Sequence, residues 1–151
     1  KQNPPKGKLT FKYFQKLHKQ IFGDIYEWAG KVRNVNIAKG NMFCDCRFIE
    51  DMMEELFSEL EKENYLQPCD TEEMADRLAY YLSEINALHP FREGNGRTQR
   101  LFIEILAERA GYEVDFSEVS AEEMVEASAK AFLRDYGKMN ELMRRIVKKI
   151  I

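Results

Sequence analysis

A short stretch between two apolar segments of this sequence concentrates residues that could bind a polyanion. Residues 89–97 have the sequence His-Pro-Phe-Arg-Glu-Gly-Asn-Gly-Arg, so a proline and two glycines interrupt the surrounding helical pattern. Gly94 and Gly96 flank Asn95, and residues of these types tolerate the left-handed backbone angles that let successive N–H groups converge on an anion. The stretch therefore predicts an anion-binding loop.

Two arginines indicate which anion this loop binds. Arg97 and Arg100 are three residues apart and share a face of the helix expected to follow the loop. The N-terminus of that helix adds unpaired N–H groups and partial positive charge at the same place. Each guanidinium can pair with its own phosphoryl group, which suits a polyphosphate better than a single phosphate. We expect the ligand to be a nucleoside di- or triphosphate.

An acid and a histidine add reactivity to the loop. Glu93 would repel phosphates unless a divalent cation lay between them, and Mg²⁺ commonly takes one or two carboxylates together with substrate phosphates and water. His89, with an ordinary pKa of about 6.5, can be neutral at cellular pH and accept a hydroxyl proton. Taken singly, these residues are typical of helix ends, solvated surfaces and turns. Their combination within residues 89–100 favours a functional site.

Helices are the elements that must position this loop. Ser120 with Glu123, and Asp70 with Glu73, have the spacing of capping pairs that open a helix. His18 falls in a basic helix and is expected to be exposed. Apolar residues recur at helical spacing over residues 10–23, 48–60, 70–88, 97–111 and 139–150.

One segment has a different pattern. Over residues 32–43, Val35 and Ile37 alternate with polar residues and a Lys-Gly-Asn turn follows, which predicts a β-hairpin. The fold class we predict is mainly α, a helical bundle with a small β-hairpin. Residues 1–8 are expected to form an exposed lead-in to a single domain over residues 1–151, cropped at its N-terminus because no initiator Met is present.

The composition narrows the classes of partner. The chain has a net charge of -3 and a pI near 5.6, so direct nucleic-acid binding is not expected. No apolar run approaches the ~20 residues that span a bilayer, so no membrane partner is expected. The three cysteines are interpreted as reduced thiols in a cytosol-like compartment. A basic cluster at the end of the last helix is interpreted as its solvated face; it comprises Arg144, Arg145, Lys148 and Lys149.

Residues 89–100, HPFREGNGRTQR, resemble the Fic family signature HPFx[D/E]GNGRxxR at every specified position. Residues 22–30 (FGDIYEWAG) and 41–44 (NMFC) are similar to the Fic segments that lead into and through a flap over the active site. The resemblance implies the Fic fold and a protein adenylyltransferase. Such an enzyme transfers AMP from Mg-ATP to a Ser, Thr or Tyr hydroxyl of a target protein and releases pyrophosphate.

The resemblance also implies a role for each residue of the loop. His89 would be the general base, Phe91 would anchor the loop in the core, and Glu93 would hold Mg²⁺. Related Doc-type kinases, which transfer the γ-phosphate, typically have lysine where this chain has Gly96, so the glycine favours AMP transfer. Phosphate binding is implied for Gly94, Asn95 and Gly96 at the α-phosphate, Arg97 at the β-phosphate and Arg100 at the γ-phosphate.

Two further regions are implied to take part. The free edge of the flap would pair with a target segment and point its hydroxyl at His89, although a purely structural hairpin is an equal alternative. Tyr136 and Leu142 are candidates for an adenine pocket, with core packing as the alternative for Leu142. The flap would comprise Asn36, Ile37, Ala38, Lys39, Gly40, Asn41, Met42 and Phe43.

The resemblance also bears on how the activity would be inhibited and in which cell it would act. Many Fic proteins are held inactive by a helix of pattern [S/T]xxxE[G/N], which does not occur in this sequence. An inhibitory antitoxin protein, or a helix outside this chain, would then supply it, in the bacterial cytoplasm or in a host cell that receives an effector. The alternatives are a nucleotide-binding interaction module with suppressed catalysis, and a Fic transferase that uses UTP, GTP or CDP-choline.

Overall fold

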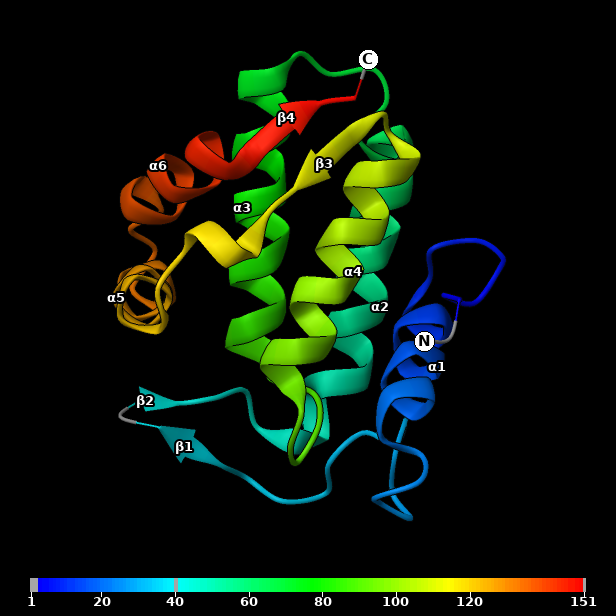
Figure 1. The fold of residues 1–151 in the computed structure, drawn as a ribbon. Helices are drawn as coiled ribbons and strands as arrows, with labels where there is room; N and C mark the ends of the chain where they lie inside the picture. The colour runs from blue at the N-terminus through cyan, green and yellow to red at the C-terminus, as the bar shows by residue number, and fades with distance from the viewer. Residues whose placement is uncertain (1–2, 40, 151) are drawn as a thin grey trace.

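Helices form most of the computed structural model, which describes residues 3–39 and 41–150 (Figure 1). Short antiparallel strand pairs accompany them, so the predicted mainly α fold class is confirmed. The strands are β1 (Ala38–Lys39) with β2 (Asn41–Met42), and β3 (Tyr112–Val114) with β4 (Val147–Lys149). The α-helices are α1 (Phe11–Phe22), α2 (Ile49–Lys62), α3 (Thr71–Leu88), α4 (Asn95–Arg109), α5 (Ala121–Phe132) and α6 (Gly137–Ile146).

Local side-chain caps start several of these helices where the sequence predicted them. The Asp70 side chain accepts a hydrogen bond from the main-chain N–H of Glu73 at the start of α3. Ser120 and Glu123 form a reciprocal capping box at the start of α5. Each such cap satisfies an otherwise unpaired N–H group and stabilises its helix by about 1 kcal/mol. Because each cap joins residues only three positions apart, the beginnings of α3 and α5 do not depend on contacts with distant parts of the chain.

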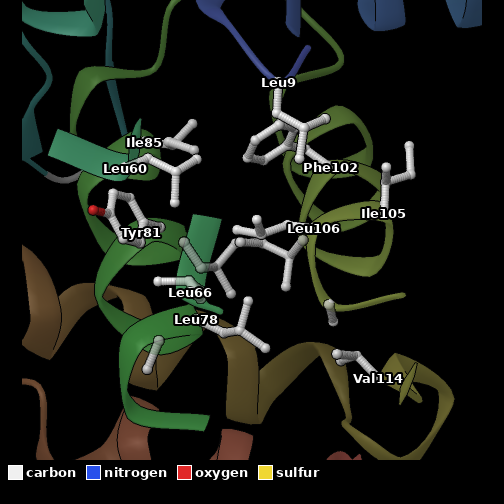
Figure 2. Close-up of a cluster of buried hydrophobic side chains, with 14 of the residues drawn as sticks. Leu9, Leu60, Leu66, Leu78, Tyr81, Ile85, Phe102, Ile105, Leu106 and Val114 are labelled. Atoms are coloured by element: carbon white, nitrogen blue, oxygen red, sulfur yellow. The ribbon is translucent and has the colours of Figure 1, made fainter. Parts of the chain in front are cut away.

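Helix α3 is the centre of the bundle and contacts α2, α4, α5 and α6. Figure 2 shows part of the resulting core, with Tyr81 and Ile85 of α3 on one side and Phe102 and Leu106 of α4 on the other. All four side chains are buried. Because α3 and α4 are fixed to each other by this core, the short loop that joins them at residues 89–94 is held at both ends.

The C-terminal helix is shorter than predicted. Helix α6 ends at Ile146, and the next residues form β4, which pairs with β3. Asp115 N–H donates to Ile146 O at 3.2 Å, and Ile150 N–H donates to Gly111 O at 2.9 Å. The helical periodicity was misleading here because an apolar pair such as Ile146 and Val147 fits either element, and the pairing partner lies more than thirty residues earlier.

The basic cluster predicted on this helix is therefore divided between two elements. Arg144 and Arg145 lie on α6, where Arg144 forms an ion pair with Asp76 and Arg145 with Glu123. The two lysines of the cluster lie on β4 and are exposed. The arginines thus connect α6 to neighbouring helices and are not simply solvated.

The predicted hairpin is confirmed as β1–β2, although the strands are short. Ala38 pairs with Met42 and Lys39 pairs with Asn41, while Gly40 lies outside the described residues. Figure 1 shows this hairpin at the same end of the bundle as the loop between α3 and α4. The fold therefore brings the predicted flap and the predicted anion-binding loop together.

The N-terminal segment runs along the bundle before α1. Residues 3–8 are mostly exposed, and residues 1–2 lie outside the described part of the chain. Tyr13 Oη donates to Pro5 O at 2.7 Å, and Arg109 Nη1 donates to Gly7 O at 2.6 Å, so side chains of two helices tether this segment. Within residues 3–39 and 41–150, no helix is both long enough and apolar enough to cross a bilayer.

Candidate active site

His89 ends helix α3 in an unusual backbone conformation. Its φ and ψ are 48° and 65°, in the left-handed region, and its N–H donates to Ile85 O at 2.9 Å. The residue is only 6% exposed, and its ring stacks on Phe43 of the hairpin, with 3.9 Å between centroids and 5° between planes. The left-handed turn at the helix end thus directs the imidazole toward the hairpin.

The hydrogen bonding of His89 determines which ring nitrogen can accept a proton. Nδ1 lies 3.3 Å from Asn86 O, and because a carbonyl only accepts, Nδ1 carries the hydrogen. Nε2 is then left with a lone pair. Burial lowers the pKa of His89 to about 4, and the cations Lys39 and Arg33 act in the same direction. The imidazole is therefore neutral near pH 7.

Phe91 and Asn95 fix the interior of the loop. Phe91 is fully buried and stacks on His18 and Phe14, at 3.8 Å and 5.7 Å between centroids. Asn95 Oδ1 accepts from Phe91 N–H at 2.9 Å, and Asn95 Nδ2 donates to Phe91 O at 2.7 Å. Both polar groups of this amide, which is 3% exposed, are thus engaged by the main chain of Phe91. What Asn95 can offer a phosphate is its main-chain N–H.

Gly94 allows the loop to enter α4 closely beneath Phe22. Its φ is 78°, and an added Cβ would lie 2.3 Å from a ring carbon of Phe22. Gly94 is the N-cap residue of α4 and has no side chain to cap it, so the first-turn N–H groups remain available to an external acceptor. An exposed helix N-terminus of this kind favours phosphate.

The predicted charged residues surround this helix N-terminus. Glu93 and Arg97 are exposed, and Arg97 lies over the Phe22 ring with its guanidinium carbon 5.6 Å from the ring centroid. Arg100 is half-buried, and its Nη1 would lie 2.9 Å from a Cβ added to Gly96. The two guanidinium groups therefore flank the first turn of α4, where the loop exposes its N–H groups.

The expectation that His18 is exposed was wrong, because its side chain is 0% exposed. Gly30 N–H donates to His18 Nδ1 at 2.9 Å, so Nε2 carries the hydrogen and donates to Glu93 O, also at 2.9 Å. Burial lowers the pKa of His18, which keeps the ring neutral. The signal was present in the sequence: His18 is four residues from both Phe14 and Phe22 and so lies on the apolar face of α1.

A second buried residue, Arg33, was not singled out from the sequence. It is 3% exposed, and its Nε donates to His89 O at 2.7 Å. Its main-chain N–H donates to Pro90 O at 2.9 Å. No spacing pattern identifies such a residue, because its partners are main-chain carbonyls.

The hairpin predicted as a flap lies beside His89. Phe43 is buried against the imidazole, Ile37 is half-buried, and Phe43 N–H donates to Ile37 O at 3.2 Å. The side chains of Asn36, Ala38, Lys39 and Met42 are exposed. Among the described residues β1 pairs only with β2, so its outer edge can pair with another strand.

The two residues considered for an adenine pocket lie in different surroundings. Leu142 is buried in the main hydrophobic core. Tyr136 is half-buried at the start of α6, and its Oη donates to Glu84 at 2.6 Å. Glu84 lines a cavity of about 580 Å³ together with Phe43 and Leu88, so Tyr136 lies near this cavity and Leu142 belongs to the core.

The sequence matches a known protein family and is similar to named proteins. The model of the Fic/DOC family matches residues 8–107. The chain is 44% identical to "Protein adenylyltransferase VbhT" of Bartonella schoenbuchensis over 140 residues. The aligned residues are 92% of this chain and 29% of that protein. The chain is 39% identical over 145 residues to "Probable protein adenylyltransferase y4lH" of Sinorhizobium fredii, covering 95% of this chain and 76% of that protein. The chain thus spans less than a third of the first relative.

Solved structures agree with the sequence comparisons. The crystal structure of the BepC protein with bound AMPPNP, a VirB-translocated effector from Bartonella tribocorum, has a TM-score of 0.89 and 26% identity, covering 99% of this chain and 79% of that chain. The N-terminal Fic domain of a Bep effector with bound ADP from Bartonella quintana has a TM-score of 0.92 and 32% identity. The match covers 98% of this chain and 77% of that chain.

Proposed function

The chain belongs to the Fic/DOC family, and we propose that it transfers AMP from Mg-ATP to a Ser, Thr or Tyr hydroxyl of another protein. The observation that carries the proposal is the position of a neutral imidazole, His89, at one end of a six-residue loop whose other end exposes the N-terminus of α4. The relatives named as protein adenylyltransferases and the nucleotide-bound neighbours support the same activity.

In the proposed step, His89 Nε2 accepts the proton of the target hydroxyl. The hydroxyl oxygen forms a bond to the α-phosphorus of ATP, and the bond from that phosphorus to the bridging oxygen breaks. Pyrophosphate leaves with the electron pair, and the target keeps AMP as a phosphodiester. The hydrogen bond from Nδ1–H to Asn86 O supports this role, because it orients the ring and leaves Nε2 free to act as the base.

We assign phosphate binding to the loop and the first turns of α4. The main-chain N–H groups of Gly94, Asn95 and Gly96 would receive the α-phosphate region. Arg97 would pair with the β-phosphate and Arg100 with the γ-phosphate. The support is geometric, since Arg97 and Arg100 flank the exposed helix N-terminus and each guanidinium can form two parallel bonds to a phosphoryl group.

Glu93 is the residue proposed to hold Mg²⁺, and the donor set fits this ion. Among residues 3–39 and 41–150, no group of three or more His, Cys, Asp or Glu side chains is arranged to hold a metal ion. A cation at this site must therefore take most ligands from phosphates and water, which is how Mg²⁺ is commonly bound beside nucleotides. The bound ion would neutralise phosphate charge. The hydrogen bond from His18 to Glu93 O steadies the main chain that carries this carboxylate.

The hairpin and the neighbouring cavity are proposed to recognise the two substrates. A segment of the target protein would pair with the free edge of β1 and so bring its hydroxyl to His89. Tyr136, near the cavity lined by Phe43 and Glu84, is retained as a candidate for the adenine side of the site. Leu142 is buried in the core, so its core-packing alternative is the one we adopt.

Inhibition is proposed to come from outside this chain, through an antitoxin protein or a separate helix. The setting follows the relatives: the Bartonella neighbours are described as effectors translocated by VirB, which makes delivery into a host cell one proposed destination. Action inside the bacterium is the other. Expression with and without a candidate inhibitor, followed by labelling of bacterial and host lysates, would separate these settings.

The test is incubation of the chain with ATP labelled in the α-phosphate, Mg²⁺ and cell lysate, beside His89→Ala. We expect label on at least one lysate protein with the wild type and none with the variant. Calorimetry must show that both proteins bind Mg-ATP, so that a loss of transfer is not a loss of binding. Retained binding with no His89-dependent label would favour the interaction module, and label displaced by excess UTP, GTP or CDP-choline would favour another donor.

A further inference from the structure

Arg33 is a buried cation that lies outside the loop but bonds to it. Its guanidinium donates to main-chain carbonyls from two separate parts of the chain. At the end of α3, Nε donates to His89 O at 2.7 Å and Nη2 donates to Leu88 O at 3.2 Å. At the hairpin, Nη1 donates to Val35 O at 2.7 Å and Nη2 donates to Cys44 O at 2.6 Å. One planar group therefore joins the helix end to the hairpin.

The positions of these carbonyls show which segment Arg33 attaches to the end of α3. Val35 and Cys44 stand immediately before and after residues 36–43, so Arg33 holds both ends of the flap. Cys44 N–H also donates to Ala87 O at 3.3 Å. The flap is thus attached to α3 through its two ends, while β1 and β2 project beyond the attachment.

We propose that Arg33 is a positioning residue that sets the distance between the flap and His89, so that a target segment paired with β1 presents its hydroxyl to the imidazole. The inference rests on the proposed function, because it takes His89 as the base and β1 as the docking edge. Arg33 itself is not proposed to touch either substrate.

The chemistry of arginine explains why this residue type is required. Burying a charge is costly unless it is hydrogen-bonded, and here four carbonyl oxygens surround the guanidinium. Two of them belong to the end of α3, where the helix dipole adds partial negative charge. A planar fork with five N–H donors can reach oxygens on several sides, whereas a lysine ammonium offers a compact group with three donors. Lysine would keep the charge and lose part of the attachment.

Phe43 connects the Arg33 attachment to the proposed base, His89. This residue is adjacent to Cys44, and its ring stacks face to face on His89. With Cys44 O and His89 O held by the same guanidinium, the two rings are kept in contact. Loss of the attachment would let the hairpin move relative to the base, and displacements of about 1 Å in such geometry can reduce rates by about a hundredfold.

The experiment compares Arg33→Lys with Arg144→Lys. Arg144 is the control because its guanidinium also makes several side-chain contacts, to Asp76 and Glu72, and these partners lie in the first turns of α3, at the end of that helix opposite the loop. Three readouts are taken: the ring-proton resonances of the two histidines, the affinity for Mg-ATP, and His89-dependent label transfer. The histidines are His18 and His89 alone, so a His18→Phe spectrum assigns them.

We expect Arg33→Lys to move the His89 ring resonances toward unstacked values, because the Phe43 ring current is lost. We expect label transfer to fall by about a hundredfold. Affinity for Mg-ATP should change little, since Arg33 bonds to the flap side of the loop. Arg144→Lys should leave all three readouts as in the wild type. Unchanged resonances in Arg33→Lys, or the same changes in Arg144→Lys, would overturn the proposal.

A measurement on the unaltered protein covers the case in which Arg33→Lys does not fold. If the attachment is a single unit, the amides of Phe43, Cys44 and His89 should exchange with solvent deuterium with similar opening free energies. Much faster exchange of Phe43 and Cys44 than of His89 would contradict it. Should the wild type transfer no label, the proposed function fails, while resonances and exchange still decide the role of Arg33.

Discussion

Lowering the pH from 7 to 5 should destabilise this protein through His89. The unfolded imidazole has a pKa of about 6.5, and burial lowers the pKa to about 4 in the folded chain. The unfolded state therefore takes up the proton first as the pH falls. The stability associated with a neutral His89 is fully present above about pH 6.5 and is lost progressively as the pH falls through about 4.

The size of the effect follows from the two pKa values. At pH 5 most unfolded imidazoles are protonated and most folded ones are not, which lowers the free energy of unfolding by about 2 kcal/mol relative to pH 7. Below about pH 4 the loss approaches about 3 kcal/mol. Because domains are typically stable by only about 5–15 kcal/mol, a change of this size is readily measured.

The assay is urea unfolding at pH 7 and pH 5 for the wild type and for His89→Gln, whose side chain does not titrate. His18, whose pKa is also lowered by burial, contributes to both proteins and cancels in the comparison. We expect the wild type to lose about 2 kcal/mol more than the variant between the two pH values. Equal losses would show that the native imidazole has an ordinary pKa, and the argument for a buried, neutral base would fail.

Three further predictions concern Gly94, His18 and Arg100. Gly94→Ala should lower the free energy of unfolding by several kcal/mol, because the φ of Gly94 is positive and the new Cβ would meet Phe22. The control is Gly111→Ala, which is also at positive φ but in open space and should cost only about 1–2 kcal/mol. Equal melting temperatures of the two variants would contradict the steric argument. His18→Phe should cost about 1–3 kcal/mol in urea unfolding, because two part-buried main-chain groups, Gly30 N–H and Glu93 O, lose their partner; an unchanged midpoint would show that they find another. Arg100→Ala should weaken Mg-ATP binding more than Mg-ADP binding in calorimetry, and equal losses would remove its assignment to the γ-phosphate.

The sequence was sufficient for the features that depend on neighbouring residues. The caps at Asp70 and Ser120 act over three residues, so the starts of α3 and α5 could be predicted. Strand β4 could not, because its hydrogen-bonding partner β3 is distant in the chain and a helical reading of Val147 fits the same periodicity. Long-range pairing decided this segment, and single-sequence periodicity carries no information about it.

The same distinction applies to the site. The segment from His89 to Arg100, which comprises the loop and the first turns of α4, is contiguous, so its residue types and their proximity could be identified from the sequence. The support for that loop comes from elsewhere: His18 bonds to Glu93 O, and Arg33 bonds to His89 O. In both contacts the acceptor is a main-chain carbonyl, which every residue possesses, so no pair of side-chain types signals the contact. Only the folded chain shows that the N-terminal third holds both ends of the loop.

The most direct measurement compares ATP labelled in the α-phosphate with ATP labelled in the γ-phosphate, using the same lysate, Mg²⁺ and chain. If His89 directs a target hydroxyl to the α-phosphorus, protein should acquire only the α label, and His89→Ala should abolish it. Transfer of the γ label would mean that the nucleotide binds in the reversed orientation and that the chain is a kinase. Transfer of neither label, with Mg-ATP bound, would contradict the proposed catalysis itself.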